Sequence, residues 1–421
     1  MRNFHVVIGG GGFGGLTAAK RLGKEIRNRK LPCKLTLIDK ENHHLFQPLL
    51  YQVATAGLAA TDIAVPIRSE LNRFEQIDVR METIERIDLE QKILFSSKGS
   101  LSYDFLILSL GMRVNYFGHD EWSSFCLGLK TLGDGRLIRN AILNAFEQAE
   151  IEKDPKEQQK YLTFVIVGGG PTGVELAGAL AELSKKSLKK DFRNIDPKKS
   201  RIVLIEAAPR ILLPYTERLS MQARRCLEKM GVEIILSRPV EKIEKGKIIF
   251  KGGMIEASTI LWAAGVCAVQ LPGLDVPKEK DGRIKVLEDL TIPGHPEVFV
   301  IGDMASLPGV PAVAPAAIQM GKYVAYEITR RIAFQSGLSL DRDVSKPTAF
   351  HYLDKGMMTT LGRGKALVQF RNFGFNGFIA WIVWLLIHII TLISFRNRLS
   401  VLIQWAWAYL RFQPGARLLS K

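Results

Sequence analysis

The 421-residue sequence predicts an α/β fold in which two similar strand–turn–helix units are followed by an apolar helical region at the C-terminal end. Three observations lead to this prediction. Residues 10–15 form a glycine-rich run between an apolar stretch and a helix-forming stretch, and residues 168–173 repeat that arrangement. Residues 378–395 are almost continuously apolar. A chain of this length exceeds one ordinary hydrophobic core, so two to three domains are expected.

The first unit has the order of a dinucleotide-binding fold. Residues 5–8 predict a buried strand, and a G-x-G-x-x-G pattern follows. Its first glycine permits a tight turn, the second a close approach to a pyrophosphate, and the third helix–strand packing. The pyrophosphate is expected at the helix N-terminus. The next strand, residues 35–38, ends at Asp39, where an acid can bond a ribose hydroxyl. The loop residues expected to contact the dinucleotide are Gly10, Gly12, Phe13, Gly14 and Gly15.

The second unit repeats this order. Residues 163–167 predict a strand, residues 174–183 an alanine-rich helix, and residues 201–206 a strand that ends in Glu206. This carboxylate would accept hydrogen bonds from a 2′-hydroxyl and repel a 2′-phosphate, which favours NADH over NADPH. Residues 184–200 form a lysine-rich insertion, expected to be a solvated basic face, with contact to lipid headgroups as the alternative. The glycines of the second pattern are Gly168, Gly170 and Gly173.

Two dinucleotide-binding units in one chain indicate a redox enzyme with a resident FAD and a visiting nicotinamide. We expect an FAD-binding domain over residues 1–135 and 281–340, an NADH-binding domain over 155–280, and a C-terminal quinone-site and membrane-anchor region over 345–421. Asp303 is expected to bond the ribityl chain or pyrophosphate region; its alternative role is a helix N-cap, and both roles can coexist. Small residues after the predicted strands supply the remaining cofactor contacts: Gly111, Ala264, Gly265 and Gly302.

With these motifs in place, the chain resembles the type II NADH dehydrogenases, the single-subunit NADH:quinone oxidoreductases. The resemblance covers nearly the whole length. It rests on residues 45–54 (LFQPLLYQVA), 168–178 (GGGPTGVELAG), 301–303 (IGD), 350–363, 380–381 and 396–399. It implies that hydride passes from NADH to FAD, and that two electrons with two protons then pass to a membrane quinone, by a ping-pong mechanism without proton pumping.

The resemblance also implies three catalytic residues. Glu175, expected in the first turn of the second unit's helix, would seat the nicotinamide or relay protons; the alternative is an acid that complements the helix dipole. Lys355 would stabilise a quinone anion, with a solvated turn lysine as the alternative. The family often has two glutamines four residues apart beside the quinone. Gln319 is the second of them, but Pro315 replaces the first, so one hydrogen bond to the quinone is lost or replaced.

The C-terminal region and the net charge of +16 indicate a membrane surface. No nucleic-acid-binding motif is recognisable, so no nucleic acid partner is expected. As one helix, residues 378–395 would be about 27 Å long, barely enough to span the hydrocarbon core. A single crossing would place the following cations on the outer side, against the positive-inside tendency. These cations are Arg396, Arg398, Arg411, Arg417 and Lys421.

An interfacial segment is therefore favoured, which makes the protein peripheral (monotopic) on the cytosolic face of the cytoplasmic or inner membrane. A spanning helix and a buried dimer helix are the alternatives, and a homodimer is plausible. The tryptophans expected at headgroup depth are Trp381, Trp384, Trp405 and Trp407.

Several other chemistries are disfavoured. The four cysteines lie far apart without a C-x-x-C pair, so neither a disulfide reductase nor a metal site is expected. A sulfide:quinone oxidoreductase stays open only if Cys126 and Cys267 meet. A ferredoxin or rubredoxin reductase would not need the apolar tail, and the retained acids argue against a mainly non-catalytic flavoprotein. His388 is expected to form a polar stripe with Thr391 and Ser394, and to hydrogen-bond within a helix pair. His43 and His44 are expected to be structural.

Overall fold

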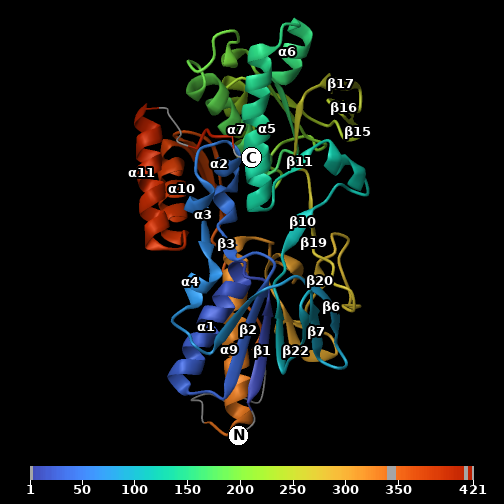
Figure 1. The fold of residues 1–421 in the computed structure, drawn as a ribbon, viewed down its shortest axis with the longest axis vertical. Coiled ribbons are helices and arrows are strands. Elements are labelled where there is room, and N and C mark those ends of the chain that lie inside the picture. The colour runs from blue at the N-terminus through green and yellow to red at the C-terminus, as the bar shows by residue number, and fades with distance from the viewer. Residues whose placement is uncertain (1–2, 339–347, 412–415, 420–421) are drawn as a thin grey trace. The chain divides into compact units, whose positions relative to one another are not determined.

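The computed structural model describes residues 3–338, 348–411 and 416–419, and the chain packs as two units (Figure 1). The first unit contains residues Met1–His44, Val65–Arg113 and Val266–Lys355. The second contains Leu45–Ala64, Val114–Gly265 and Gly356–Lys421. Each unit is therefore assembled from three separate stretches of chain. The functional domain ranges expected from the sequence stay a prediction, because these units are defined by packing and not by the nucleotide they hold.

A six-stranded sheet organises the first unit, in the order β21-β22-β9-β1-β2-β5. All neighbours are parallel except β21 and β22. Its middle strands are almost fully buried, as expected for a parallel sheet covered on both faces. Helix α1 (Phe13–Arg29) connects β1 to β2, and α9 (Ala314–Gln335) packs against α1. The strands are β1 (Phe4–Gly9), β2 (Cys33–Asp39), β5 (Ile77–Met81), β9 (Phe105–Leu108), β21 (Thr291–Ile292) and β22 (His295–Val300).

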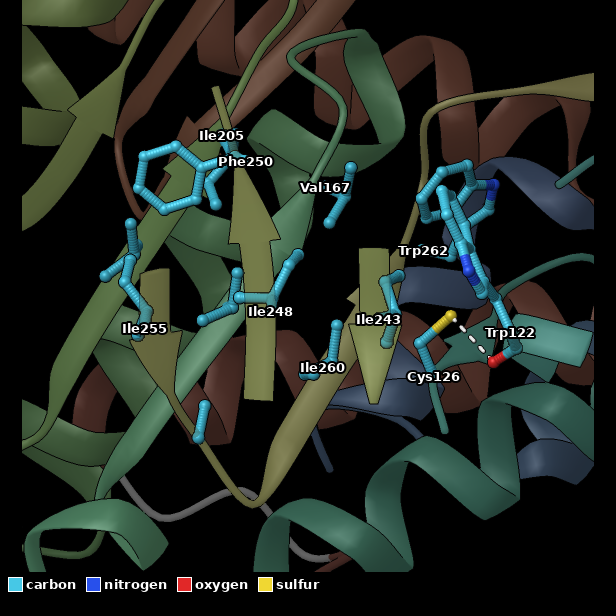
Figure 2. Packing of buried hydrophobic residues seen from close by; sticks show 13 residues of the cluster. Trp122, Cys126, Val167, Ile205, Ile243, Ile248, Phe250, Ile255, Ile260 and Trp262 are labelled. Atoms are coloured by element: carbon cyan, nitrogen blue, oxygen red, sulfur yellow. Dashed lines mark hydrogen bonds between the residues drawn. The ribbon is translucent and has the colours of Figure 1, made fainter. Parts of the chain in front are cut away.

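The second unit contains a parallel sheet in the order β11-β18-β12-β13-β14. Helix α7 (Pro171–Glu182) follows β12, and α8 (Glu217–Lys229) precedes β14. The core of this unit lies between the parallel sheet and a small antiparallel sheet, where Ile248, Phe250 and Ile260 pack together (Figure 2). The strands are β11 (Leu127–Gly128), β12 (Thr163–Val167), β13 (Arg201–Ile205), β14 (Val232–Ile235), β15 (Val240–Glu244), β16 (Lys247–Phe250), β17 (Gly253–Glu256) and β18 (Thr259–Trp262).

The two units repeat one topology. The order β9-β1-β2-β5 of the first sheet matches the order β18-β12-β13-β14 of the second. In both, a three-stranded antiparallel sheet is inserted before the strand that returns to the centre; in the first unit it consists of β6 (Ile84–Asp88), β7 (Ile93–Ser96) and β8 (Gly99–Ser102). This repeat confirms the predicted α/β fold with two Rossmann-like dinucleotide-binding units.

The remaining elements connect these sheets or follow them. The helices are α2 (Leu50–Ala54), α3 (Ala60–Ile63), α4 (Ile67–Leu71), α5 (Leu132–Ile151) and α6 (Pro155–Tyr161). The short strands are β3 (His43–Leu45), β4 (Ala64–Pro66), β10 (Met112–Val114), β19 (Val266–Ala268), β20 (Ile284–Lys285) and β23 (Ala305–Ser306). A C-terminal antiparallel sheet contains β24 (Met357–Gly362), β25 (Lys365–Phe370) and β26 (Phe373–Gly377).

The apolar C-terminal stretch is two helices, so the prediction of one helix over residues 378–395 is wrong. Helix α10 (Phe378–Thr391) has 14 residues, and α11 (Phe395–Arg411) has 17. Between them Leu392 is buried, and Ser394 adopts a left-handed conformation with φ 73°. Arg398 Nε donates to Leu392 O at 2.8 Å, which satisfies a carbonyl at the break. Ser394 therefore lies outside α10 and does not extend a stripe with His388. None of the helices in the described part of the chain has both the length and the apolarity needed to cross a bilayer.

Helices α10 and α11 form a hairpin (Figure 1) whose inner side is closed by aromatic rings. The rings of Trp384 and Trp405 are 5.4 Å apart, and His388 stacks on Trp384 at 4.3 Å. His388 Nδ1 donates to Trp384 O at 2.7 Å within α10, and burial lowers the pKa of His388 to about 4. His388 is therefore structural, but its hydrogen bond lies within α10, so the expectation of a bond across a helix pair is wrong. Trp384 and Trp405 are only 1% and 3% exposed, so the expectation that these two reach headgroup depth is wrong.

The hairpin is held on the segment that contains α2 and α3. Asp62 is buried and accepts hydrogen bonds from Ser400 Oγ and Gln404 Nε2, both at 2.9 Å. Trp405 Nε1 donates to Gln52 Oε1 at 2.8 Å. Asn397 Nδ2 donates to the carbonyl oxygens of Thr61 and Ala64 at 3.3 and 3.4 Å. The C-terminal helices therefore belong to the second unit and are fixed to it by polar as well as apolar contacts.

Candidate functional site: two nucleotide loops and a carboxylate cavity

The first glycine loop has the shape that its pattern predicts. Gly10 has φ +97°, and a Cβ there would lie 2.2 Å from Ser109 O. A Cβ at Gly15 would lie 1.8 Å from Gly10 O, so helix and strand approach too closely for any side chain. Gly12 is exposed, and a Cβ there would meet no atom within 4 Å. The loop is therefore tight at both ends and open in the middle, where a pyrophosphate would need room.

The N-terminus of α1 is suited to an anion. Gly12 is its N-cap, and the helix has neither a side-chain cap nor an acidic residue in its first turn. A helix N-terminus of this kind favours phosphate oxygens through its amide groups and its dipole. Phe13 packs edge-on against His44 at 4.9 Å, and His44 Nδ1 donates to Gly11 O at 3.0 Å. Burial lowers the pKa of His44 to about 4, so this histidine is a neutral support of the loop, as expected.

The second glycine loop has the same geometry. Gly168 has φ +108° and lies against the backbone of Ala263 and Ala264, with a built Cβ only 2.6 Å away. A Cβ at Gly173 would lie 1.9 Å from Gly168 O, whereas one at Gly170 would meet no atom within 4 Å. Gly170 is the N-cap of α7, which has neither a side-chain cap nor an acid in its first turn. Both units thus present an open helix N-terminus to an anion.

The two acids that close these patterns occupy equivalent positions. Asp39 Oδ2 accepts from Gly11 N at 2.5 Å, and Glu206 Oε2 accepts from Gly169 N at 2.5 Å. Each carboxylate accepts a second backbone bond from its own turn, from the amide of Glu41 to Asp39 at 2.8 Å and from that of Ala208 to Glu206 at 2.7 Å. Burial raises the pKa of Asp39. Each acid therefore lies beside its glycine loop, within reach of a nucleotide held there.

The remaining cofactor candidates divide between the units. In the first unit, Gly111 has φ +71° and open space around it, while Gly302 has φ +70° and its N–H donates to Met320 Sδ at 3.2 Å. Asp303 lies inside the 3-10 turn Gly302–Met304, and the N-cap of α9 is Val313, so the alternative N-cap role of Asp303 is wrong. In the second unit, Ala264 and Gly265 follow β18, and a Cβ at Gly265 would lie 2.6 Å from the Phe117 ring.

Glu175 lines a cavity of the second unit. The structure places it in the second turn of α7 and not in the first, which corrects the sequence-based expectation and weakens the helix-dipole alternative. Thr360 N donates to Glu175 Oε1 at 3.4 Å, a long contact. Because the carboxyl is largely desolvated, its pKa is raised to about 8. The other lining residues are Tyr51, Gln52, Thr55, Gly57, Ala179, Glu182, Leu183, Ser187, Thr360, Gly362, Arg363, Trp381, Trp384 and Trp405.

Three elements bring these residues together: α2, α7 with the turn after it, and the C-terminal hairpin with β24. The sequence motifs identify Glu175 but not its neighbours Glu182 and Arg363. Arg363 N donates to Glu182 Oε1 at 2.7 Å. A seven-residue spacing puts Glu175 and Glu182 on one side of α7, which is the signal that could have identified the second acid.

Gln319 and Lys355 both lie in the first unit. Gln319 Nε2 donates to Leu353 O at 3.0 Å, and Leu353 N donates to Gln319 Oε1 at 2.9 Å. The Lys355 side chain is exposed, two residues further along the same segment. Pro315 lies at the start of α9, where a backbone N–H has no partner within the helix. The proline is therefore accommodated without loss of a helix hydrogen bond.

The four cysteines form no disulfide in the structure. All four are free, and Cys33 and Cys126 are buried. Cys126 is part of the second unit's core, where its thiol donates to Trp122 O at 3.3 Å (Figure 2), and burial raises its pKa to about 12. A thiol this protonated is a poor nucleophile, which argues against sulfide:quinone chemistry. Within residues 3–338, 348–411 and 416–419, no group of three potential ligands could hold a metal ion.

Comparison with known proteins agrees with this geometry. A family model described as pyridine nucleotide-disulphide oxidoreductase matches residues 4–321. Two type II NADH:quinone oxidoreductases of Mycobacterium tuberculosis, Ndh and NdhA, are each 40% identical, over 98% and 96% of this chain and 90% and 87% of theirs. A type II NADH:quinone oxidoreductase of Staphylococcus haemolyticus is 30% identical over 85% of this chain and 87% of its own.

Solved structures support the same fold. The structure of NDH2 from Plasmodium falciparum in complex with NADH matches with a TM-score of 0.86, over 100% of both chains at 18% identity. The sulfide:quinone oxidoreductase from Aquifex aeolicus matches with a TM-score of 0.73, over 94% of this chain and 92% of that one, also at 18% identity. The identity and coverage of the mycobacterial relatives, together with the paired nucleotide loops, lead to one assignment: the chain belongs to the family of type II NADH:quinone oxidoreductases.

Proposed function

We propose that this protein is an FAD-dependent NADH:quinone oxidoreductase that works at a membrane surface. It oxidises NADH and reduces a quinone, as its family membership indicates. When bound, FAD would supply the redox chemistry, which is hydride acceptance from NADH and two-electron transfer to the quinone, in a ping-pong order without proton pumping. The protein's own residues bind, orient and exchange protons.

The nucleotide loops divide the binding roles. In the first unit, Gly12, Asp39 and Asp303 are assigned to FAD, with the pyrophosphate at the N-terminus of α1. In the second unit, Gly170 and Glu206 are assigned to NADH, with its pyrophosphate at the N-terminus of α7. The additional contacts assigned to FAD are Gly10, Phe13, Gly14, Gly15, Gly111 and Gly302, and those assigned to NADH are Gly168, Gly173, Ala264 and Gly265.

The observation that carries the quinone part of the proposal is the cavity around Glu175. Reduction of a quinone to a quinol consumes two protons, so the site needs a group that holds a proton at neutral pH. With a pKa of about 8, Glu175 is mostly protonated at pH 7 and can donate. The same cavity is lined by Trp381, Trp384 and Trp405 of the apolar hairpin, which offers aromatic surface to a quinone ring. Lys355, an exposed cation of the first unit, is assigned to stabilise the quinone anion.

Purified, FAD-loaded protein should oxidise NADH in the presence of a soluble quinone analogue, followed by the loss of NADH absorbance. A protein that oxidises NADH with ferricyanide but not with quinone would contradict the quinone assignment. A colourless protein that does not take up FAD would contradict the whole proposal.

Glu206→Gln is expected to narrow the preference for NADH over NADPH by about 10-fold, measured as the ratio of the two kcat/KM values. The carboxylate repels the 2′-phosphate of NADPH, and the amide does not. The variant keeps an oxygen that can accept from Gly169 N, so the loop should stay in place. Asp39→Asn, the equivalent change in the other unit, is the matched control and should leave this ratio unchanged. If the ratio of the two kcat/KM values is unaltered in Glu206→Gln, this carboxylate does not discriminate between the 2′-hydroxyl of NADH and the 2′-phosphate of NADPH.

The outer side of the C-terminal hairpin is proposed to bind the lipid surface. Eleven large apolar side chains of α10 and α11 are at least 38% exposed, far more than singly scattered surface residues would give. Arg396 is exposed on the same hairpin, and no acidic residue follows Asp354 in the sequence. An apolar face with cations and no anions fits the boundary between acyl chains and anionic headgroups. The exposed residues are Phe378, Ile379, Ile382, Leu386, Ile387, Ile390, Phe395, Leu399, Leu402, Ile403 and Trp407.

The double variant Ile390→Glu/Ile403→Glu should lower binding to anionic liposomes by at least about 10-fold in a sedimentation assay. These side chains are 66% and 60% exposed, so the hairpin itself should stay folded. Met254→Glu, at a 61% exposed position of β17 in the same unit, is the matched control and should bind like wild type. Unchanged liposome binding, or instead the loss of a homodimer, would assign this face to a partner other than lipid. On this proposal the enzyme is peripheral, on the cytosolic face of the cytoplasmic membrane.

A further inference from the structure

Helix α9 carries a row of polar side chains that hold the segment of residues 348–355, called the strap below. Gln319, Tyr323 and Glu327 are spaced by four residues, which places them along one side of the helix. All three hydrogen-bond to the strap. Within the described part of the strap there is no helix or strand. Its position is set by one backbone hydrogen bond, from Phe350 N to Glu288 O at 2.7 Å, and by side-chain contacts of this kind.

The three contacts cover the length of the strap. Gln319 makes two opposite hydrogen bonds with the backbone of Leu353, at 3.0 and 2.9 Å. The Tyr323 hydroxyl donates to Thr348 O, and its ring packs 5.5 Å from that of Phe350. Thr348 Oγ1 donates to Glu327 Oε1 at 3.2 Å. The strap is thus held at Thr348, at the buried Phe350 and at Leu353, two residues before Lys355.

Glu327 is the residue of the row whose position is most tightly restrained. Its side chain is fully buried, and Oε2 lies 2.7 Å from Arg330 Nη2 and 3.9 Å from Arg331 Nε. Arg331 is itself bound to Asp289 at 3.1 Å. A buried carboxylate between two guanidinium groups has little freedom, because leaving either charge unpaired would be costly.

The other side of α9 is fixed to the first glycine loop. A Cβ at Gly321 would lie 2.4 Å from Gly14 O, and the Ala317 methyl lies 3.4 Å from the position of a Cβ at Gly302. Helix α9 therefore contacts the cofactor loop on one side and the strap on the other. Any displacement of the strap relative to this loop requires breaking the contacts of the polar row.

We propose that Gln319, Tyr323 and Glu327 act as a positioning row that fixes the strap, and with it Lys355, relative to the nucleotide loop of the first unit. Gln319 is assigned to Leu353 and not to the quinone, because both ends of its amide are engaged by the strap backbone. The link to catalysis rests on the proposed role of Lys355 at the quinone; the restraint of the strap does not depend on it.

Tyr323→Phe is the sharpest test, because it removes one hydroxyl and keeps the ring that packs on Phe350. We expect the KM for a quinone analogue to rise about 3- to 10-fold, as loss of one positioning hydrogen bond allows. The rate of NADH oxidation with ferricyanide and the FAD content should stay unchanged. Amide hydrogen exchange of the strap should become faster. Tyr326→Phe, at an exposed position of the same helix, is the matched control and should match wild type in every measurement.

A double-mutant cycle separates the positioning role of Gln319 from direct contact with the quinone. If Gln319→Ala and Tyr323→Phe act through the same strap, their effects on the quinone KM are less than additive. Fully additive effects, with a Gln319→Ala defect that leaves strap exchange unchanged, would overturn the assignment of Gln319. If amide hydrogen exchange of the strap is unchanged in both single variants, the positioning role of all three residues is refuted. If the exchange becomes faster but the protein has no quinone activity, the positioning role stands and the proposed function is refuted.

Discussion

Gly173→Ala should yield a yellow, FAD-loaded protein whose affinity for NADH is at least about 100-fold weaker, a loss of about 3 kcal/mol in binding. The added methyl would lie 1.9 Å from Gly168 O, where neither partner can move without separating α7 from β12. The helix N-terminus that is assigned to the NADH pyrophosphate is then displaced. The FAD loop belongs to the other unit and is not touched by the change.

Stopped-flow reduction of the flavin by NADH measures this loss directly, and flavin absorbance reports the FAD content. Gly15→Ala should give the reciprocal phenotype, since its methyl would lie 1.8 Å from Gly10 O in the FAD loop: an apoprotein that does not retain FAD. Gly133→Ala in α5, whose nearest neighbour would be 3.6 Å away, is the control for adding a methyl to a helix of the second unit. If Gly173→Ala fails to fold, Gly170→Ala meets no atom and should weaken NADH binding in a folded protein. Normal NADH affinity in both variants would refute the assignment of NADH binding to the second glycine loop.

These paired loops are the part of the molecule that the sequence predicted best. A G-x-G-x-x-G run has only one common backbone shape, because its first and third glycines have no room for a Cβ. Strand, loop, helix and closing acid are consecutive in the chain, so local order was enough to place Gly10, Asp39, Gly168 and Glu206. The repetition of the pattern also predicted the repeated sheet order.

The C-terminal region was predicted less well because apolarity alone does not show where a helix ends. The run from Phe378 to Phe395 contains no proline or glycine that would mark a break. The break at residues 392–394 arises from packing: Leu392 is buried, and Arg398 binds its carbonyl. The aromatic residues of the hairpin then divide between its two sides, so Trp384 is buried while Trp407 is 55% exposed. No local pattern distinguishes the two.

The neighbours of the predicted site residues could not be predicted for a related reason. Tyr323 and Glu327 meet the strap only after the chain has returned to α9, and the partners of Glu175 come from three separated segments. Gln319 illustrates the point most clearly. Its position in the sequence suggested a quinone ligand, but its amide is bound to Leu353, thirty-four residues along the chain. A motif predicts which residue is present, whereas its hydrogen-bond partner is set by tertiary structure.

Glu175→Gln should lower kcat with quinone by about 100-fold and leave NADH oxidation with ferricyanide almost unchanged, because only the quinone half of the reaction needs a proton donor. In the wild type, kcat with quinone should fall above pH 8 as Glu175 loses its proton. The pH profile of the Glu175→Gln variant should lack this decrease. Glu182→Gln changes the other acid of the cavity, and its pH profile should keep the decrease. If kcat of Glu175→Gln still falls near pH 8, another group donates the proton.

The same substitution tests the two explanations of Glu175 by their opposite effects on stability. A folded-state pKa of about 8, above the ordinary value of 4.5, means that the folded protein keeps a proton that the unfolded chain releases. The contribution of Glu175 to the free energy of unfolding is then greatest below pH 4.5 and is lost as the pH rises through 8. Glu175→Gln removes this loss, so its Tm should equal that of wild type at pH 4.5 and exceed it increasingly up to pH 9. A carboxylate that served only the helix dipole would behave in the opposite way: its pKa would be lowered, and glutamine would destabilise the protein at pH 7. A lower Tm of Glu175→Gln at pH 9 would therefore refute the desolvated, proton-holding carboxyl on which the quinone chemistry depends.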